Sequence, residues 1–348
     1  MSTEFLFIVG FIVFIGLMMA IDLGLFGKAS KPVSLKQAGI MSAVWVTLAM
    51  VFYVLILNFG HYLHDIDTLA KLRDINQKHL HRLAIDNHNL VTSLQAYRKT
   101  LGLEFLTGYV VEYALSVDNI FVMVLIFTAF GVAPKNYHTV LLWGITGAIV
   151  MRFLFIFLGA ALIERFYWIL YVFGAFLVYT GISMFINRNK EEKIDPEKHP
   201  VVKFSARFFA VHPHFEGNKF FVKIDGKKLI TPLFLVLLII ETTDLIFAVD
   251  SIPAILSITK DPYIVFFSNI FAILGLRSMF FLLVNIIEKF HYLKVGLAAL
   301  LAFIGLKMLA SHYAEQIGLT TFNSLLIILG ILTISIVASL ISPKKKPA

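Results

Sequence analysis

Two short sequence elements place acidic residues inside long apolar stretches. Glu112 and Asp118 belong to EYALSVDNI, and Asp244 and Asp250 belong to DLIFAVDSI. Each element has an acid, four further residues, then Val-Asp, a polar residue and Ile. A charge at the bilayer centre costs roughly 2.5–3.5 kcal/mol even on a lenient scale, so residues of this kind usually serve a function. We therefore expect these acids to bind a charged ligand.

The candidate metal ligands all carry oxygen donors. They are Glu112, Asp118, Asn119, Glu241, Asp244, Asp250 and Ser251. Carboxylate, amide and hydroxyl oxygens suit Mg²⁺, Ca²⁺ or Mn²⁺, whereas Zn²⁺ and Cu²⁺ favour imidazole and sulfur. The histidines fall in loops or at span ends, and we interpret the methionines as lipid-facing or packing residues. The set predicts a transported divalent cation, Mn²⁺ first, and no permanently bound cofactor.

Helix geometry constrains which of these ligands can meet. Residues six apart lie about 120° apart around a regular helix, so Glu112 and Asp118 do not share a face, whereas Glu112 and Asn119 do. Asp118 and Asp250 could still reach a common site if their helices unwind locally. Pro253 gives a reason for unwinding in the second element, because its ring disrupts helical hydrogen bonding.

Basic residues accompany the acids inside the apolar stretches. The candidates for charge pairing or gating are Arg152, Arg277 and Lys307. Five acids (Glu112, Asp118, Glu241, Asp244, Asp250) against three bases leave a net charge of −2, which one divalent cation would neutralise. Protons would do the same in an empty site, which suggests proton coupling. A structural ion-pair network would give a similar pattern. Asp22, at the end of the first span, is a candidate entrance ligand or an interfacial cap.

Nine apolar stretches are long enough to position these residues as membrane helices. They lie at about residues 5–25, 38–59, 105–127, 139–162, 168–185, 233–255, 264–287, 295–309 and 322–341. The fold class is therefore an all-α polytopic bundle.

The middle spans form two similar units of three. Arg152 and Arg277 occupy the second span of each unit, and Gly181 matches Gly305 in the third. An odd number of spans gives the units opposite orientations, as in the inverted repeats of many secondary transporters. The predicted parts are two N-terminal helices (1–59), an extracytoplasmic amphipathic loop (60–103), repeat 1 (104–186), a basic cytoplasmic loop (187–230), repeat 2 (231–312) and a C-terminal helix with a basic tail (313–348).

Composition and charge support a membrane location. Of 348 residues, 59% are hydrophobic and only 15% charged, and the net charge is +8. The basic residues flank the spans, which favours membrane orientation over nucleic-acid binding. Most of them lie inside the cell if the N-terminus is outside and the C-terminus is cytoplasmic. The absence of cysteine excludes disulfides and thiolate metal sites.

Other functions leave weaker signals. HExxH, GxSxG and nucleotide-binding glycine loops are absent from the sequence, so an enzyme is not expected. A membrane scaffold or assembly factor in metal stress, recruiting partners through the basic loop, remains an alternative, and the oligomeric state is open. The 60–103 loop carries five histidines among acids, which indicates either metal collection or, more simply, a solvated cap. They are His61, His64, His79, His81 and His88.

The sequence resembles the TerC (tellurium-resistance C) family of the lysine-exporter superfamily. The matching stretches are FLTGY (105–109), EYALSVDN (112–119), LYVFGAFLVYTGISM (170–184), ETTDLIFAVDSIPAI (241–255), SNIFAILGLRSMFFLL (268–283) and GLKML (305–309). The resemblance implies a bacterial inner-membrane protein of metal homeostasis that exports Mn²⁺. By this resemblance, the acids in EYALSVDN and ETTDLIFAVDS are expected to be site residues.

Overall fold

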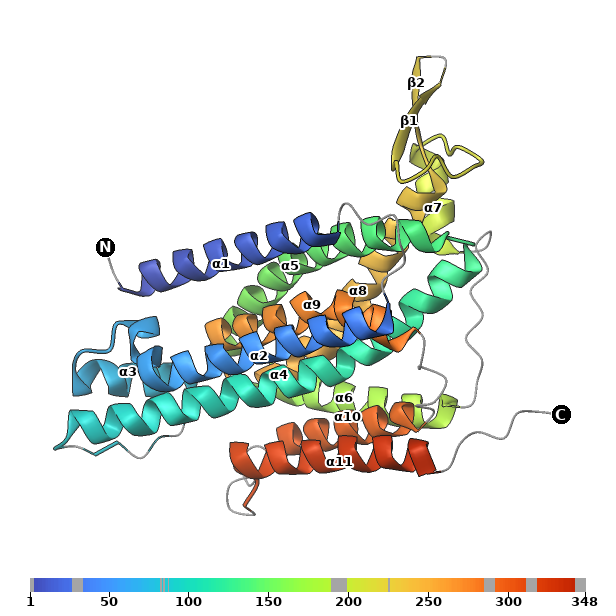
Figure 1. Ribbon diagram of the computed structural model, residues 1–348. Coiled ribbons are helices and arrows are strands. Elements are labelled where there is room, and N and C mark those ends of the chain that lie inside the picture. Colours follow the sequence, from blue (N-terminus) through green and yellow to red (C-terminus); the bar gives the residue numbers. More distant parts are fainter. Residues whose placement is uncertain are drawn as a thin grey trace.

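The computed structural model describes most of the chain as membrane-length helices (Figure 1). The described residues are 3–26, 34–81, 83, 85–86, 88–188, 199–224, 226–284, 292–310 and 318–341. The helices are α1 (Thr3–Phe26), α2 (Leu35–Phe59), η1 (Gly60–His64), α3 (Leu69–His79), α4 (Leu90–Ala129), α5 (Pro134–Arg165), α6 (Ile169–Asn187), α7 (Pro200–Phe208), α8 (Pro232–Leu256), α9 (Pro262–Leu283), α10 (Leu293–Leu309) and α11 (Thr321–Ile341).

Local sequence explains where several long helices begin. α2 opens with a capping box, in which Ser34 accepts a hydrogen bond from the backbone of Gln37 and Gln37 accepts one from the backbone of Ser34. Proline stands in the first turn of α5, α8 and α9, where its missing N–H costs nothing. Between these starts, the apolar runs leave the backbone no hydrogen-bonding partner in lipid except itself, which requires helices.

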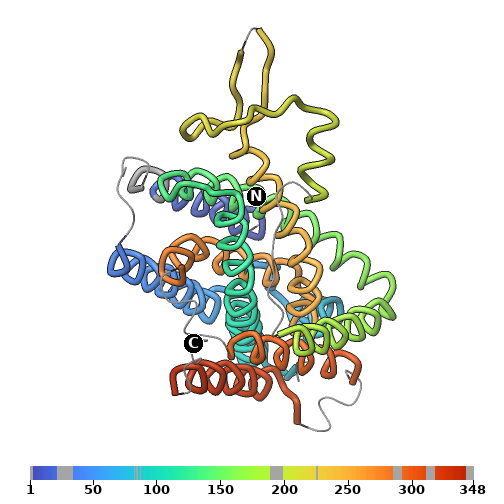
Figure 2. The backbone as a smooth tube through the Cα atoms, turned by 90° about the vertical axis from the view of Figure 1, so that its right-hand side faces the viewer, coloured from blue at the N-terminus to red at the C-terminus, as the bar shows by residue number. Residues whose placement is uncertain are grey.

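The core of the bundle is built around α4 and α9. α9 is almost wholly enclosed by the other helices, whereas α1 is largely exposed on the outside of the bundle. α4 passes through the middle of the bundle and contacts α2, α8 and α9 (Figure 2). The large apolar side chains exposed on the outer helices form the surface expected to face lipid.

Helices α6 and α10 pack closely against each other through small residues. A Cβ added at Gly181 of α6 would lie 2.7 Å from the carbonyl oxygen of Ala298, and one added at Gly305 of α10 would lie 2.7 Å from the carbonyl oxygen of Gly174. Glycine is therefore required at both positions for the backbones to approach this closely.

The polytopic helical fold is confirmed. Eight of the described helices are long and apolar enough to cross a membrane. α10, which corresponds to the predicted span at 295–309, is not among these eight; it has 17 residues and packs against α6 and α11. The exact number of spans and their orientation remain predictions.

The connecting segments differ in detail from the predicted loops. α4 begins at Leu90, so residues 90–103 are the first turns of a 40-residue helix. The basic 187–230 segment contains α7 and a two-stranded antiparallel hairpin, β1 (Phe221–Ile224) and β2 (Lys227–Ile230), which projects from the bundle. The local unwinding for which Pro253 gave a reason is not seen, because α8 stays helical from Pro232 to Leu256. Pro253 lies in its last turns, where a lost hydrogen bond disturbs little.

Candidate functional site

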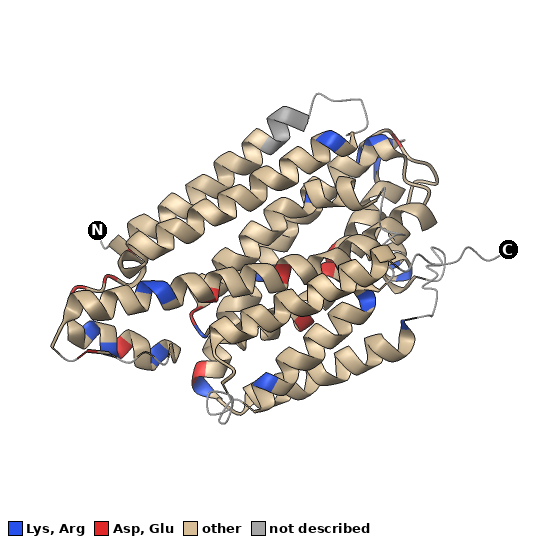
Figure 3. Cartoon of the chain, turned by 60° about the horizontal axis from the view of Figure 1, so that its bottom comes forward, with Lys and Arg blue, Asp and Glu red and all other residues tan. Residues whose placement is uncertain are grey.

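Charged side chains lie inside the bundle among otherwise uncharged helices (Figure 3). One group is centred on Arg152 of α5, whose side chain is 1% exposed. Its guanidinium contacts the Glu112 carboxylate of α4 and the Asn269 side-chain oxygen of α9. Its Nη2 lies 3.3 Å from Oδ1 of Asp244 on α8. One arginine thus links four helices, and we call these four residues the arginine cluster.

The arginine cluster partly neutralises its own charge. Glu112 is fully buried and Asp244 is 7% exposed, so neither carboxylate has much access to water. Removing charges from water is unfavourable unless partners compensate, and Arg152 provides that compensation. The Glu112 oxygen Oε2 has no hydrogen-bond partner among the described residues. The expected pairing of Arg152 with intramembrane carboxylates is therefore seen in the structure, whereas its gating role remains a prediction.

The second halves of the two repeated elements meet in a cavity. The cavity has a volume of about 390 Å³ and is lined by Asp118 and Asn119 from α4 and by Asp250 and Ser251 from α8. We call it the carboxylate cavity. Thr180 of α6 also lines it and donates a hydrogen bond of 3.3 Å to Oδ1 of Asp250. The cavity therefore joins both repeated Val-Asp elements without any break in their helices.

Basic residues stand where α6 ends and α10 begins along the same cavity. Arg188 follows the last turn of α6, and Lys294 lies in the first turn of α10. The Lys294 ammonium also lies 4.2 Å from the centre of the Phe121 ring. These positions mark one end of the bundle as the mouth of the cavity.

The cavity walls can coordinate a cation mainly through oxygen. Two carboxylates, an amide, and the hydroxyls of serine and threonine are hard donors suited to Mg²⁺, Ca²⁺ or Mn²⁺. Met184 of α6 lines the cavity as well. Its thioether is a softer donor, but Met184 also packs against the apolar core, as expected for the methionines.

The remaining predicted site residues lie elsewhere. The Glu241 carboxylate of α8 packs tightly against Gly147 of α5, where an added Cβ would overlap it. Glu241 also interacts electrostatically with Asp244. Arg277 of α9 is buried and interacts electrostatically with His138 of α5.

The charge-pairing candidate Lys307 is not placed in the arginine cluster or the carboxylate cavity. It lines a separate cavity of about 300 Å³ together with His81 and Glu104. The candidate entrance residue Asp22 falls in α1, but its side chain lies outside the described residues.

Sequence reasoning missed two members of these sites. Asn269 has no polar counterpart at the matching position of the first unit, where Gly144 stands, so the repeat gave no signal for it. Thr180 precedes Gly181 in an apolar span, and a polar residue there was the one available hint.

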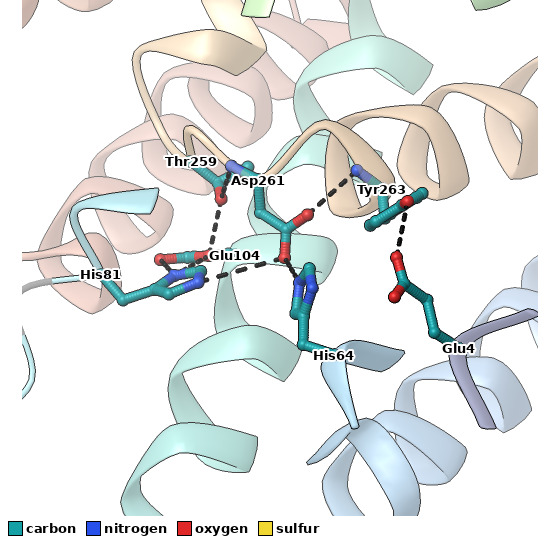
Figure 4. Close-up of polar contacts among 7 residues, drawn as sticks. All are labelled: Glu4, His64, His81, Glu104, Thr259, Asp261 and Tyr263. Atoms are coloured by element: carbon teal, nitrogen blue, oxygen red, sulfur yellow. Dashed lines mark hydrogen bonds and ion pairs between the residues drawn. The ribbon is translucent and has the colours of Figure 1, made fainter. Parts of the chain in front are cut away.

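A further polar cluster lies at the opposite end of the bundle, where α8 ends and α9 begins (Figure 4). His64 Nε2 lies 2.8 Å from Asp261 Oδ2. His81 Nδ1 lies 3.1 Å from each carboxylate oxygen of Glu104, which also accepts a hydrogen bond of 2.7 Å from Thr259 Oγ1. The 60–103 segment is thus fixed to the bundle by buried histidines, and the solvated cap is the wrong description for these positions.

Local charges set the protonation of this cluster. Burial alone would raise the pKa of Asp261, but the charge and hydrogen bond of His64, together with His79 and His81, lower it overall. Burial alone would lower the pKa of His81, but the adjacent Glu104 carboxylate raises it above its usual value. Burial lowers the pKa of His79, and Asp261 opposes this effect only in part. The cluster therefore holds a carboxylate and histidines of unequal basicity.

Comparison with known proteins identifies the family. The sequence pattern of the integral membrane protein TerC family matches residues 97–347. An uncharacterised membrane protein of Myxococcus xanthus is 43% identical over 97% of this chain and 93% of its own length. Proteins named as a membrane-bound redox modulator, Alx, are 42% identical in Salmonella typhi (94% of this chain, 92% of theirs) and in Escherichia coli K12 (86% and 84%). No solved structure matches. The chain belongs to the TerC family of integral membrane proteins.

Proposed function

We propose that the protein is a secondary transporter that exports divalent metal ions, Mn²⁺ first, from the cytoplasm through the carboxylate cavity. The observation that carries the proposal is the meeting of Asp118 and Asp250, one from each repeated element, in a single cavity with oxygen donors around them. Two carboxylates carry the charge that one divalent cation neutralises. A scaffold gains nothing from burying such a pair inside a membrane, where each charge is costly.

The helix packing supports movement of two units around this cavity. α4 packs against α9, α5 against α8, and α6 against α10. If α4, α5 and α6 are exchanged for α8, α9 and α10 respectively, the same three helix pairs result. A two-fold axis between two inverted repeats would have this effect. In such transporters, rocking of one unit against the other exposes a fixed midplane site to each side in turn. On this proposal the basic mouth at Arg188 and Lys294 faces the cytoplasm.

The arginine cluster complements the cavity. On α4, Glu112 lies seven residues before Asn119, which is about 10 Å along a helix. Arg152 holds Glu112 and Asp244 together and so joins α4 and α5 of one unit to α8 of the other. We infer that this pairing stabilises the closed arrangement on the far side of the cavity. Proton entry in exchange for metal follows from the same chemistry, because carboxylates that lose a cation gain a proton most readily in a low-dielectric setting.

The name of the Alx relatives raises redox chemistry as a second possibility. This chain contains no cysteine, so thiol–disulfide exchange is not available to it. Metal transport needs only the oxygen donors that line the cavity.

Reconstituted protein provides the test. We expect Mn²⁺ flux into proteoliposomes that contain the full chain alone, and we expect Asp118→Asn and Asp250→Asn each to abolish it. Asn keeps the size of the side chain but removes the charge that the cation needs. Asp74→Asn, on the exposed surface of α3, is the matched control and should transport normally. Wild-type flux in either cavity variant at equal incorporation would show that the cavity does not carry the metal.

A further inference from the structure

Three buried residues at the opposite end of the bundle form a set of converging metal donors. One donor atom from each of His64, His79 and Asp261 lies within 4.8 Å of the other two. All three residues are buried, with exposures of 5%, 8% and 0%. The two imidazole rings are stacked with centres 5.1 Å apart. The set combines two nitrogen donors with one oxygen donor.

Asp261 divides its two carboxylate oxygens between different tasks. Oδ1 caps α9 by accepting a hydrogen bond of 3.0 Å from the backbone N–H of Tyr263. Oδ2 points toward the histidines and lies 2.8 Å from His64 Nε2 and 4.0 Å from His81 Nε2 (Figure 4). The cap therefore fixes the carboxylate in an orientation that presents Oδ2 to the cluster.

His81 has the arrangement of an oriented metal ligand. Glu104 binds its Nδ1, and Thr259 holds the Glu104 carboxylate in place. Metal-binding histidines commonly donate their other ring N–H to a carboxylate in this way, which fixes the tautomer. The opposite nitrogen, Nε2, is buried and has no hydrogen-bond partner among the described residues. It faces Asp261 and is free to serve as a fourth donor.

Cavities on two sides give an ion access to these donors. One, of about 620 Å³, is lined by His64 and His79, together with Glu4 and Glu164. The other, of about 300 Å³, is lined by His81 and Glu104. Lysines line both cavities as well, so the cavities provide a route to the donors and no electrostatic attraction for a cation.

We propose that His64, His79, His81 and Asp261 form a binding site for Zn²⁺ or a similar transition-metal ion, distinct from the carboxylate cavity. Three imidazole nitrogens and one carboxylate oxygen match the donor types and the four-fold coordination of protein zinc sites. The oxygen-lined carboxylate cavity has the opposite preference. The same chain therefore holds two sites of different chemistry at opposite ends of the bundle.

The bound ion would join segments that are distant in sequence. His64 ends η1, His79 ends α3, and Asp261 precedes α9. An ion at this point clamps the 60–89 segment onto the turn between α8 and α9. Because α8 and α9 also contribute to the arginine cluster, the clamp fixes the end of the helix hairpin that carries Asp244 and Asn269.

The test uses full-length protein without a histidine tag, purified in detergent and titrated with Zn²⁺ against a coloured chelator. We expect His79→Gln and Asp261→Asn to weaken binding strongly. Asn also caps helices well, so Asp261→Asn retains the cap of α9, although it removes the charge that pairs with His64. His79→Gln leaves both the cap and that ion pair in place and is therefore the more informative variant. Glu104→Gln should weaken binding by about 10- to 100-fold, the usual effect of losing a carboxylate that orients a ligand. His88→Gln, an exposed histidine of the same segment, is the matched control and should bind as wild type does.

Two further measurements separate this site from the carboxylate cavity and from loose surface binding. Zn²⁺ affinity should persist in the Asp250→Asn variant, whose cavity is disabled. Co²⁺ in place of Zn²⁺ should give the intense visible absorption of tetrahedral coordination, and His79→Gln should remove it. Equal Zn²⁺ affinity in wild type and His79→Gln, loss of binding in Asp250→Asn alone, or an octahedral Co²⁺ spectrum would each overturn the proposal.

Discussion

Replacing Arg152 with methionine should be among the most damaging single changes in the bundle. Methionine keeps the length and apolar stem of the side chain but removes the charge that contacts Glu112, Asp244 and Asn269. Two acids from different helices would then face each other without that charge between them. The effect should appear in stability before transport is considered.

The structure sets the size of the effect. At the 3.3 Å separation of Arg152 Nη2 and Asp244 Oδ1, two unit charges attract by roughly 5 kcal/mol at an effective dielectric constant of 20. Removing one partner of a buried ion pair typically costs about 3–5 kcal/mol, because the other charge is left buried without compensation. All three groups are at most 7% exposed, so water cannot screen them. We therefore expect Arg152→Met to lower the free energy of unfolding by about 3–5 kcal/mol.

Reversible unfolding in mixed micelles with increasing sodium dodecyl sulfate, followed by tryptophan fluorescence, measures this quantity. Arg165→Met, on the exposed end of the same helix, is the matched control and should change stability little. Adding Glu112→Gln to Arg152→Met should restore about 1–3 kcal/mol, because a neutral amide is less costly to bury than an uncompensated carboxylate. An Arg152→Met protein as stable as the Arg165→Met control would refute the ion-pair reasoning. So would a double variant less stable than the single one.

Three other predictions follow from the packing and from the chemistry of the carboxylate cavity. Gly181→Ala and Gly305→Ala should each destabilise the protein by about 1–3 kcal/mol, since the new methyl would overlap the facing backbone between α6 and α10. Gly330→Ala on α11, which meets nothing within 4 Å, should be nearly neutral in the same unfolding assay, and equal effects at all three positions would contradict the close approach. Mn²⁺ flux in proteoliposomes should increase when the imposed pH gradient drives protons in the opposite direction, and flux indifferent to the gradient would exclude proton exchange. Flux of Mn²⁺ should exceed that of Zn²⁺, because oxygen donors dominate the cavity despite Met184, and faster Zn²⁺ flux would mean that the thioether controls selectivity.

Much of the bundle could be predicted because lipid imposes one solution on the backbone. Every predicted span corresponds to a helix, with ends that agree within a few residues in most cases. The largest difference is α4, whose predicted start at residue 105 marks where the apolar run begins, whereas the helix itself begins at Leu90. Hydropathy detects the part of a helix inside the membrane and is blind to its polar extension.

The sequence by itself also identified which acids matter, but not how they are divided. The duplicated elements pointed to Glu112, Asp118, Asp244 and Asp250, and all four lie in the arginine cluster or the carboxylate cavity. One site was expected, and the structure contains two, since residues six apart on α4 and α8 face different neighbours. The sequence gives the number of acids and bases within the apolar spans. The partner of each of these charges depends on how the helices are rotated and packed.

Only the tertiary structure revealed Asn269 as a partner of Arg152 and brought His64 and His79 to Asp261, which lies nearly two hundred residues further along the chain. These contacts depend on the packing of α4, α8 and α9 and on the folding of η1 and α3 against them, which no local pattern encodes. Hydropathy and repeats specify the helices and the charges that they carry into the membrane. Side-chain contacts between helices decide which charges are neutralised, which line a cavity and which donors converge, because those contacts join residues with no fixed spacing in the sequence.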